Sequence, residues 1–314
     1  MGDKSVRNAV RPYTGARLWA WSHGWQFWLI IALPLAYIVI FCYVPMGGIL
    51  MAFKDYSPRR GIWQSPWVGL KWFKQFVTTP SGLTVIVNTL RLGFYSLIAG
   101  FPIPILLAVA LNEIRSLHFK KTVQMVTYAP YFISVVVMVG MLMQLTDLRI
   151  GIINRIITIL GGQPVNFFGE ARIFPHLYVW SGIWQTMGYS SIIYIAALAG
   201  VSKETQEAAV VDGASRVQRI WHVDLPAIRP TIVILLIFNC GSIMSIGFEK
   251  TYLMQNPINM ATAEVISTFV YKVGLQNANY SFSTAVGLFN SVVGFVLMVA
   301  VNQISKKLTD TSVW

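Results

Sequence analysis

Long apolar stretches separated by short polar segments dominate this sequence and restrict the folds open to it. Each stretch reaches about 20 residues, the length that an α-helix needs to cross a bilayer. Aliphatic and aromatic residues make up 55% of the chain and charged residues 11%, whereas a soluble domain is about one quarter charged. The sequence therefore predicts an all-α, polytopic membrane protein with six transmembrane helices. The predicted spans lie near residues 27–49, 84–111, 122–144, 174–200, 230–248 and 283–303.

These spans predict three parts along the chain. Residues 1–25 form a basic, tryptophan-containing segment in the cytoplasm or at the membrane interface, residues 26–305 form the six-helix transmembrane domain, and residues 306–314 form a cytoplasmic tail. The first span outruns the apolar core of a signal peptide, and no A-x-A cleavage site follows it. We therefore expect it to be a retained membrane anchor.

The polar loop between the fourth and fifth spans reads ETQEAAVVDGASRVQRIWHVDLP over residues 204–226. Ser202 is placed to cap a helix from Lys203 to about Asp212, and Gly213 is placed to end it. The two alanines at positions 208 and 209 favour helix and allow close approach of another surface. The pattern predicts a short exposed helix followed by a turn.

A second short helix is predicted to begin at Ser215 and to carry Arg216 and Arg219. Proline lacks a backbone N–H and disrupts the interior of a helix. Pro226 and Pro230 are therefore expected to close this helix off before the next apolar run begins. Together the two helices predict a compact projection, the coupling loop 201–226, between membrane spans.

The spacing inside this loop resembles the EAA motif of permeases from binding-protein-dependent ATP-binding cassette (ABC) importers. Glu207, Ala208 and Ala209 are followed at matching distances by Gly213 and by the pair Leu225-Pro226, written here as 225–226. The stretches NTLRLGFYSLIAGFPIPILLAVALNEIRS, FKKTVQMVTYAPYFIS and STAVGLFNSVVG also resemble oligosaccharide-type permeases. The chain is most similar to the first permease of the pair in the group with the lipoprotein-associated polysaccharide and alginate systems.

The resemblance implies a type I importer for oligo- or polysaccharide, built from several subunits. Two different but related permeases form the pore, two ATPase subunits bind below it, and an extracytoplasmic solute-binding protein delivers the substrate. The coupling helix would sit in a groove of the ATPase, with Glu207 facing a basic side chain. The implied coupling site consists of Glu207, Ala208, Ala209, Asp212, Gly213, Ala214, Leu225 and Pro226.

Because ATP is cytoplasmic, the coupling loop also predicts the orientation of the chain. Basic residues occur on both sides of the predicted spans, so the positive-inside rule alone favours this orientation only weakly. We expect a multi-pass protein of the bacterial cytoplasmic (inner) membrane, in contact with lipid, with both termini in the cytoplasm.

Sequence motifs for catalysis and for cofactors are absent. No G-x-x-x-x-G-K-[ST], G-x-S-x-G or HExxH occurs, and the two cysteines and four histidines have no metal-ligand spacing. We therefore expect no catalytic residue, no metal site and no cofactor on this chain, with ATP and Mg on the partner ATPase subunits. The net charge of +12 is scattered over loops, which does not favour nucleic acid as a partner.

The polar residues at membrane depth are the candidates for a substrate path. No Asp or Glu lies inside a predicted span, which is unlike a proton- or sodium-coupled carrier. Uncharged side chains do occur there; each makes either a helix–helix hydrogen bond or a substrate contact, and as a set they suit an uncharged, hydroxyl-rich solute. The candidate path residues are Gln144, Gln185, Asn239 and Asn290.

The motif indicates that a permease is coupled to an ATPase, but it does not identify the solute that is transported. Two other functions therefore remain open from the sequence: a permease of the same type for a peptide, an amino acid or phosphate, and an ATP-independent channel.

Overall fold

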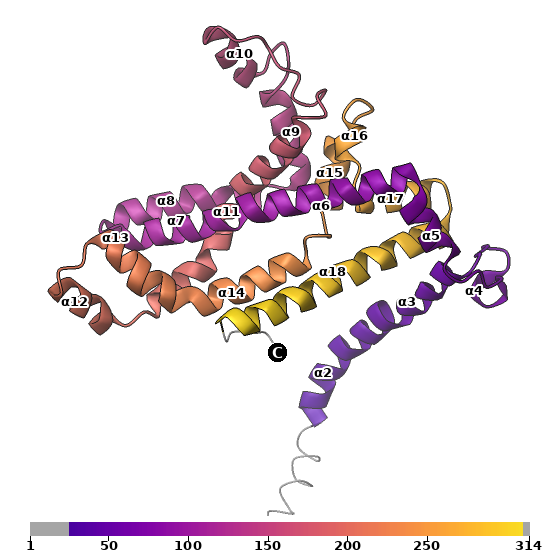
Figure 1. Ribbon diagram of the computed structural model, residues 1–314, viewed down its shortest axis with the longest axis horizontal. Coiled ribbons are helices and arrows are strands. Elements are labelled where there is room, and N and C mark those ends of the chain that lie inside the picture. Colours follow the sequence, from indigo (N-terminus) through magenta and orange to yellow (C-terminus); the bar gives the residue numbers. More distant parts are fainter. Residues whose placement is uncertain (1–24, 310–314) are drawn as a thin grey trace, which may run out of the picture. The chain divides into compact units, whose positions relative to one another are not determined.

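The computed structural model describes residues 25–309, and its regular secondary structure is helical throughout that range (Figure 1). An isolated antiparallel bridge between Lys54 and Trp67 is the exception. The all-α prediction is confirmed. The predicted N-terminal segment lies outside the described residues except for Trp25, as do residues 310–314 of the predicted tail. The chain divides into two compact units, residues 1–50 and 51–314.

The first unit contains a nearly continuous apolar helix. It comprises α2 (Trp25–Ile38), the π-helical turn η1 (Val39–Tyr43) and α3 (Val44–Met46), and the 3-10 helix η2 (Gly47–Phe53) follows. None of the most apolar window of this segment is buried inside the protein. A helix that is apolar on all sides and unburied is typical of a membrane span.

Four helices of the described region are long and apolar enough to cross a membrane, and a bent pair brings the number to five. The pair Leu117–Phe132 and Val135–Leu145 bends by 102° at its break. Helix α11 (Phe174–Ala199) has 26 residues, but its polar side chains keep it outside this set. The four single helices are Phe27–Phe53, Pro80–Glu113, Arg216–Gly241 and Tyr280–Lys307.

Helix α11 is the centre of the second unit. It packs against α6 (Pro80–Gly100), α7 (Pro102–Glu113), α8 (Leu117–Tyr128) and α14 (Leu225–Gly241). Helix α14 in turn packs along α18 (Tyr280–Thr309), which also contacts α5 and α17 (Figure 1). The remaining elements are α4 (Gly61–Gln64), α5 (Lys71–Thr78), η3 (Ala129–Phe132), α9 (Val135–Leu145), α10 (Ile152–Ile159), α12 (Lys203–Val211), α13 (Arg216–Arg219), η4 (Ile220–Asp224), α15 (Phe248–Met254), α16 (Met260–Ala263), α17 (Ile266–Tyr271) and η5 (Lys272–Gln276).

The helix after Ser215 does not stop at the prolines, so that prediction is wrong. The segments α13, η4 and α14 join into one helix over Arg216–Gly241. Pro226 lies in the first turn of α14, directly after the π-helical turn η4, and Pro230 lies inside α14. A π-helical turn changes the local hydrogen-bond register, and neighbouring helices help a membrane helix to tolerate proline.

One predicted span boundary also moves. Helix α14 ends at Gly241 rather than near residue 248, and the non-helical segment 242–247 separates it from α15. The predicted tail begins inside α18, which continues unbroken to Thr309. A hydropathy pattern locates an apolar run, but it does not show where a helix is interrupted within that run.

Two loops at one end of the second unit are joined by asparagine side chains. Asn154 is 3% exposed, and its amide bonds to the carbonyl oxygens of Thr146, Asp147 and Val165 at 3.0, 3.1 and 3.0 Å. In the segment after α15, the amide groups of Asn256 and Asn259 both donate to the carbonyl oxygen of Phe168. These bonds satisfy backbone groups that the loops would otherwise bury unpaired. The two bonds to Phe168 tie loop 146–173 to the segment that carries Asn256 and Asn259.

Glycine allows the closest helix contacts. A Cβ atom at Gly188 of α11 would lie 2.0 Å from the carbonyl oxygen of Thr127 on α8. At Gly93 of α6 it would lie 2.2 Å from the carbonyl oxygen of Ile243. Small residues at such points are the usual means by which membrane helices approach. The backbones of α11 and α8 are therefore in direct contact.

We predict that Gly188→Ala lowers stability by about 1–3 kcal/mol, because a methyl group there must push α8 away from α11. The matched control is Gly287→Ala in α18, where a Cβ would meet nothing within 4 Å. The measurement is the thermal unfolding of the purified variants in detergent, followed by size-exclusion chromatography. Equal melting temperatures for the two variants would contradict this account of the contact.

Candidate functional site

The first helix of the polar loop forms as its sequence predicts. Helix α12 covers Lys203–Val211, and the side chain of Ser202 caps its N-terminus by accepting a hydrogen bond from a backbone N–H of the first turn. At the other end, Gly213 has φ +79°, a conformation that favours glycine. The backbone N–H of Ala214 closes the turn by donating to the carbonyl oxygen of Ala209 at 2.9 Å.

The second segment also begins where it is predicted. The Ser215 hydroxyl accepts from the backbone N–H of Gln218, and the Gln218 side chain accepts from the backbone N–H of Ser215 at 2.8 Å. This reciprocal pair is a capping box, which satisfies two N–H groups at the start of a helix. The loop therefore has two fixed helix starts with a glycine turn between them.

A polar network joins this loop to the membrane helices beside it. The Gln206 side chain of α12 donates to a carboxylate oxygen of Asp224, which is 1% exposed. Arg219 donates to the Gln206 side-chain oxygen at 3.3 Å and lies 3.9 Å from the carboxylate of Glu113 at the end of α7. We call these four residues the Gln206 network. It fixes α12 to the helix that contains Asp224 and to α7.

Sequence analysis did not identify the Gln206 network. Two of its members had a visible signal, because Glu113 and Asp224 are acidic residues at the ends of apolar runs, where a buried carboxylate needs a partner. The identity of that partner depends on how the loop folds back, and sequence spacing does not give it.

The outer surface of α12 combines a carboxylate with exposed apolar side chains. Glu207 and Ala208 are exposed, as are Val210 and Val211, whose exposed fractions are 55% and 86%. Together with Gln206 and Arg219, Glu207 and the two valines line a hollow of about 310 Å³. Apolar side chains beside a charge, on a surface otherwise made of polar loop, are typical of a protein-binding site.

The other residues of the predicted coupling site lie at the ends of the two helices. Asp212 is the exposed C-cap residue of α12, and Ala214 follows the glycine turn. Leu225 begins α14 and packs, half-buried, with Ile228 and Leu198 in an apolar cluster, while Pro226 is exposed. The chain is thus guided from the projecting helix into α14.

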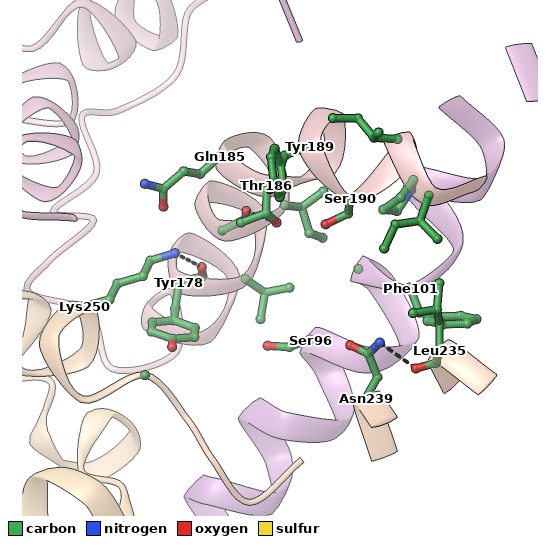
Figure 2. A pocket seen from close by; sticks show the side chains of 18 of the residues that line it. Ser96, Phe101, Tyr178, Gln185, Thr186, Tyr189, Ser190, Leu235, Asn239 and Lys250 are labelled. Atoms are coloured by element: carbon green, nitrogen blue, oxygen red, sulfur yellow. Dashed lines mark hydrogen bonds between the residues drawn. The ribbon is translucent and has the colours of Figure 1, made fainter. Parts of the chain in front are cut away.

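A cavity of about 650 Å³ lies between α6, α7, α11, α14 and α15. Two of the predicted path residues, Gln185 and Asn239, line it (Figure 2). Their amide groups donate to the carbonyl oxygens of Ile133 and Leu235, both at 2.8 Å. The other two are not among its lining residues: Gln144 lies exposed on α9, and Asn290 lies on α18. Hydroxyl groups of Ser96, Thr186 and Ser190 are also in the lining.

Lys250 of α15 also lines this cavity. Its ammonium group donates to the carbonyl oxygen of Tyr178 at 2.7 Å and lies 4.5 Å from the centre of the Tyr178 ring (Figure 2). The residue is 9% exposed, and burial lowers the pKa of Lys250 to about 7. The sequence placed it only at the end of an apolar run. Its position depends on the break after α14, which was not predicted.

Metal ligands do not gather anywhere in residues 25–309: no three His, Cys, Asp or Glu side chains lie close enough to hold an ion. Cys42 and Cys240 are free thiols. The polar groups of the loop and of the cavity are amides, hydroxyls and a few charged side chains, which bind and position other groups.

An all-helical fold with several membrane-spanning helices, a projecting polar loop and a polar cavity between helices defines an integral membrane permease. The chain belongs to the family of binding-protein-dependent transport system inner membrane components, whose family model matches residues 100–310. Proteins of this family are permease subunits.

Two relatives from Bacillus subtilis (strain 168) are similar over nearly the whole chain. Protein LplB is 44% identical over 283 residues, which cover 90% of this chain and 89% of that protein. The polygalacturonan/rhamnogalacturonan transport system permease protein YteP is 42% identical over 287 residues, covering 91% and 89%. The crystal structure of a bacterial alginate ABC transporter, in complex with an alginate pentasaccharide-bound periplasmic protein, contains a chain of the same fold. That chain is 37% identical with a TM-score of 0.86, covering 93% of this chain and 98% of its own.

We predict that Arg219→Met loosens α12 without unfolding the protein, because Arg219 is the member of the Gln206 network that reaches both Gln206 and Glu113. Hydrogen exchange of the backbone amides of residues 203–211 is expected to become at least about tenfold faster, which corresponds to a loss of about 1.4 kcal/mol. The control is Arg216→Met, which removes an exposed arginine of the same helix. Unchanged exchange in Arg219→Met would contradict the role of the network.

Proposed function

We propose that this chain is one of two different permeases in an ATP-driven type I importer for oligo- or polysaccharide. Two ATPase subunits would dock on the cytoplasmic side, and a solute-binding protein would deliver the saccharide from outside. The coupling loop carries the proposal, because it presents the spacing of an ATPase-docking element on an exposed, capped helix. The saccharide part is supported by the transport named for YteP and by the alginate pentasaccharide in the complex with the similar structure.

In the membrane, we propose six spans with both termini in the cytoplasm, in the bacterial cytoplasmic membrane. The bent pair of α8 and α9 would be the third span, and α11 would be the fourth. Helix α11 has a lower hydropathy than the other proposed spans. A span can be less apolar when it lines a polar cavity and packs on four neighbours, because it then exposes less of its surface to lipid. The coupling loop would then face the compartment that holds ATP.

For coupling, helix α12 would occupy a groove of one ATPase subunit. ATP and Mg would bind to the ATPase subunits, and this chain would contribute no group to hydrolysis. Closure of the ATPases would move α12, and the Gln206 network would carry the movement to the helix that contains Asp224 and to Glu113 on α7. This is rigid-body switching of packed helices between two arrangements.

The cavity of about 650 Å³ is proposed as part of the substrate path. Its volume lies within the range of about 300–1,000 Å³ that is usual for small-molecule sites. Its amide and hydroxyl groups, from Gln185, Asn239, Ser96 and Thr186, can both donate to and accept from sugar hydroxyls. An aromatic side chain, Tyr189, adds an apolar surface for the face of a sugar ring.

Proteoliposomes with both permeases, both ATPases and the binding protein are expected to import a labelled oligosaccharide only when ATP is supplied. Gly213→Val should reduce import and substrate-stimulated ATPase activity by about tenfold or more, because a β-branched residue is strained at the positive φ of Gly213. The control is Gly200→Ala, at a position with φ −83° just before α12. Import without ATP would support a channel, and full activity of Gly213→Val would contradict the coupling role of the turn.

Glu207 is predicted to make a charged docking contact with the ATPase. Glu207→Gln should weaken the affinity of the permease pair for the ATPase by about three- to tenfold at low salt, and the difference from wild type should shrink as salt screens the contact. Binding can be measured by surface plasmon resonance over a salt series. Glu204→Gln, on the same helix, is the matched control. Equal affinities of wild type and Glu207→Gln at every salt concentration would count against this contact.

A further inference from the structure

Among residues 25–309, Lys250 is the only charged residue that lines the cavity between α6, α7, α11, α14 and α15. The other lining residues are apolar, aromatic, hydroxyl or amide residues, and none is Asp or Glu. The ammonium group reaches from α15 to the start of α11, where it bonds to the Tyr178 carbonyl (Figure 2). A buried charged side chain is costly unless a partner of opposite charge or a bound ligand compensates it.

No carboxylate within residues 25–309 forms an ion pair with the Lys250 ammonium group. Within residues 25–309, two ion pairs form, Arg219 with Glu113 and Lys272 with Glu264, and neither includes Lys250. The neighbouring Glu249 is exposed. An ammonium group has three N–H donors, and the Tyr178 carbonyl accepts one of them. A carbonyl oxygen and an aromatic ring orient the ammonium group but carry no full negative charge, and an anion bound beside it would favour its charged form over the neutral form that burial favours.

The cavity leaves room for an anion beside the ammonium group, because its volume is about 650 Å³ and Lys250 is one of its lining residues. Gly182 of α11 lets the ammonium group lie close to that helix, since a Cβ there would be 3.1 Å from the Lys250 Nζ atom. On the other side of the cavity, Ser96 and Asn239 present a hydroxyl and an amide (Figure 2). A ligand with an acidic group beside Lys250 and several hydroxyl groups farther along the cavity belongs to one chemical class, the sugar acids.

Lys54 shows how a lysine with a purely structural role is held in the same unit. It is also 9% exposed, its Nζ atom bonds to the carbonyl oxygens of Ile62 and Trp63, and it lies over the ring of Trp67. Lys54 is not among the residues that line the cavity. Lys250 differs from it in facing space that a ligand can occupy.

We propose that Lys250 is an anion-binding residue of the cavity and gives this permease a preference for saccharides that carry carboxylate groups. The inference rests on the proposed function, and it replaces the uncharged solute expected from the sequence with an acidic one. Removal of a charged hydrogen-bond partner is expected to weaken binding of the acidic ligand by about ten- to a hundredfold.

Binding to the complex of two permeases and two ATPases, purified without the binding protein, tests the inference. The probes are trigalacturonate, the neutral trisaccharide obtained by reducing its carboxyl groups, and inorganic phosphate. Lys250→Met removes the charge, and Lys250→Gln removes it while keeping a donor for the Tyr178 carbonyl. Lys250→Arg keeps the charge, and Lys54→Met is the matched control. Size-exclusion chromatography verifies that each complex is intact.

The expected result is tighter binding of trigalacturonate than of the neutral trisaccharide by wild type. Lys250→Gln and Lys250→Met should lose that preference while still binding the neutral sugar, whereas Lys250→Arg and Lys54→Met should keep it. Equal binding of the two sugars by wild type, or an unchanged preference in Lys250→Gln, would overturn the inference. Equal displacement by inorganic phosphate would overturn its saccharide part. An assembly that imports saccharide with ATP but shows no role for Lys250 would leave the proposed function intact, and one that imports no saccharide would refute that function.

Discussion

The close contact between α11 and its neighbours is the constraint on which the rest of the second unit depends. At Gly188 the backbone of α11 lies against the Thr127 carbonyl of α8. The approach is too close for any side chain, because a Cβ atom at this position would lie 2.0 Å from the carbonyl oxygen. One turn earlier, the amide of Gln185 donates to the carbonyl oxygen of Ile133, which lies in the break between the two parts of the bent pair. The stacked rings of Tyr131 and Tyr189, 3.8 Å apart, hold the same junction. A bend of 102° frees backbone carbonyls, and a membrane helix tolerates this only where a neighbour satisfies them.

This arrangement gives Gln185 a structural part as well as a place in the cavity. The side-chain amide of Gln185 donates to the Ile133 carbonyl oxygen, and Gln185 also lines the cavity together with Thr186 and Tyr189. A polar residue of α11 thus supports the fold and lines the cavity at once. It also accounts for the polar side chains that keep α11, the central helix, out of the set of helices apolar enough to span a membrane: many of its contacts are with other helices and with the cavity.

The sequence predicted best what short-range chemistry determines. The caps at Ser202 and Ser215 and the turn at Gly213 depend on residues within five positions of one another, so their spacing was sufficient. The helix that follows was misjudged, because Pro226 and Pro230 were read as stops. Proline removes a donor, but the π-helical turn before Pro226 and the packing of α14 on α18 let the helix continue.

Long-range contacts were beyond the sequence. Asn239 and Gln185 were recognised as polar residues at membrane depth, but nothing in their spacing showed that they share a cavity, and Gln144 and Asn290 looked equivalent to them. Lys250 was overlooked because the apolar run before it hides the break at residues 242–247, which turns α15 back toward α11. The Gln206 network depends in the same way on a loop that returns to α7.

The helix over Arg216–Gly241 connects the coupling loop to the cavity. Asp224, near its start, belongs to the Gln206 network, and Asn239, near its end, lines the cavity about 22 Å farther on at the rise of an α-helix. The break after Gly241 means that α15 does not have to follow this helix, and Lys250 is bonded instead to α11. One wall of the cavity is thus attached to the coupling loop and the opposite wall to the central helix. Under the proposed function, docking that moves α12 would change the distance between Asn239 and Lys250, so the helix that transmits the movement would also open or close the proposed substrate path.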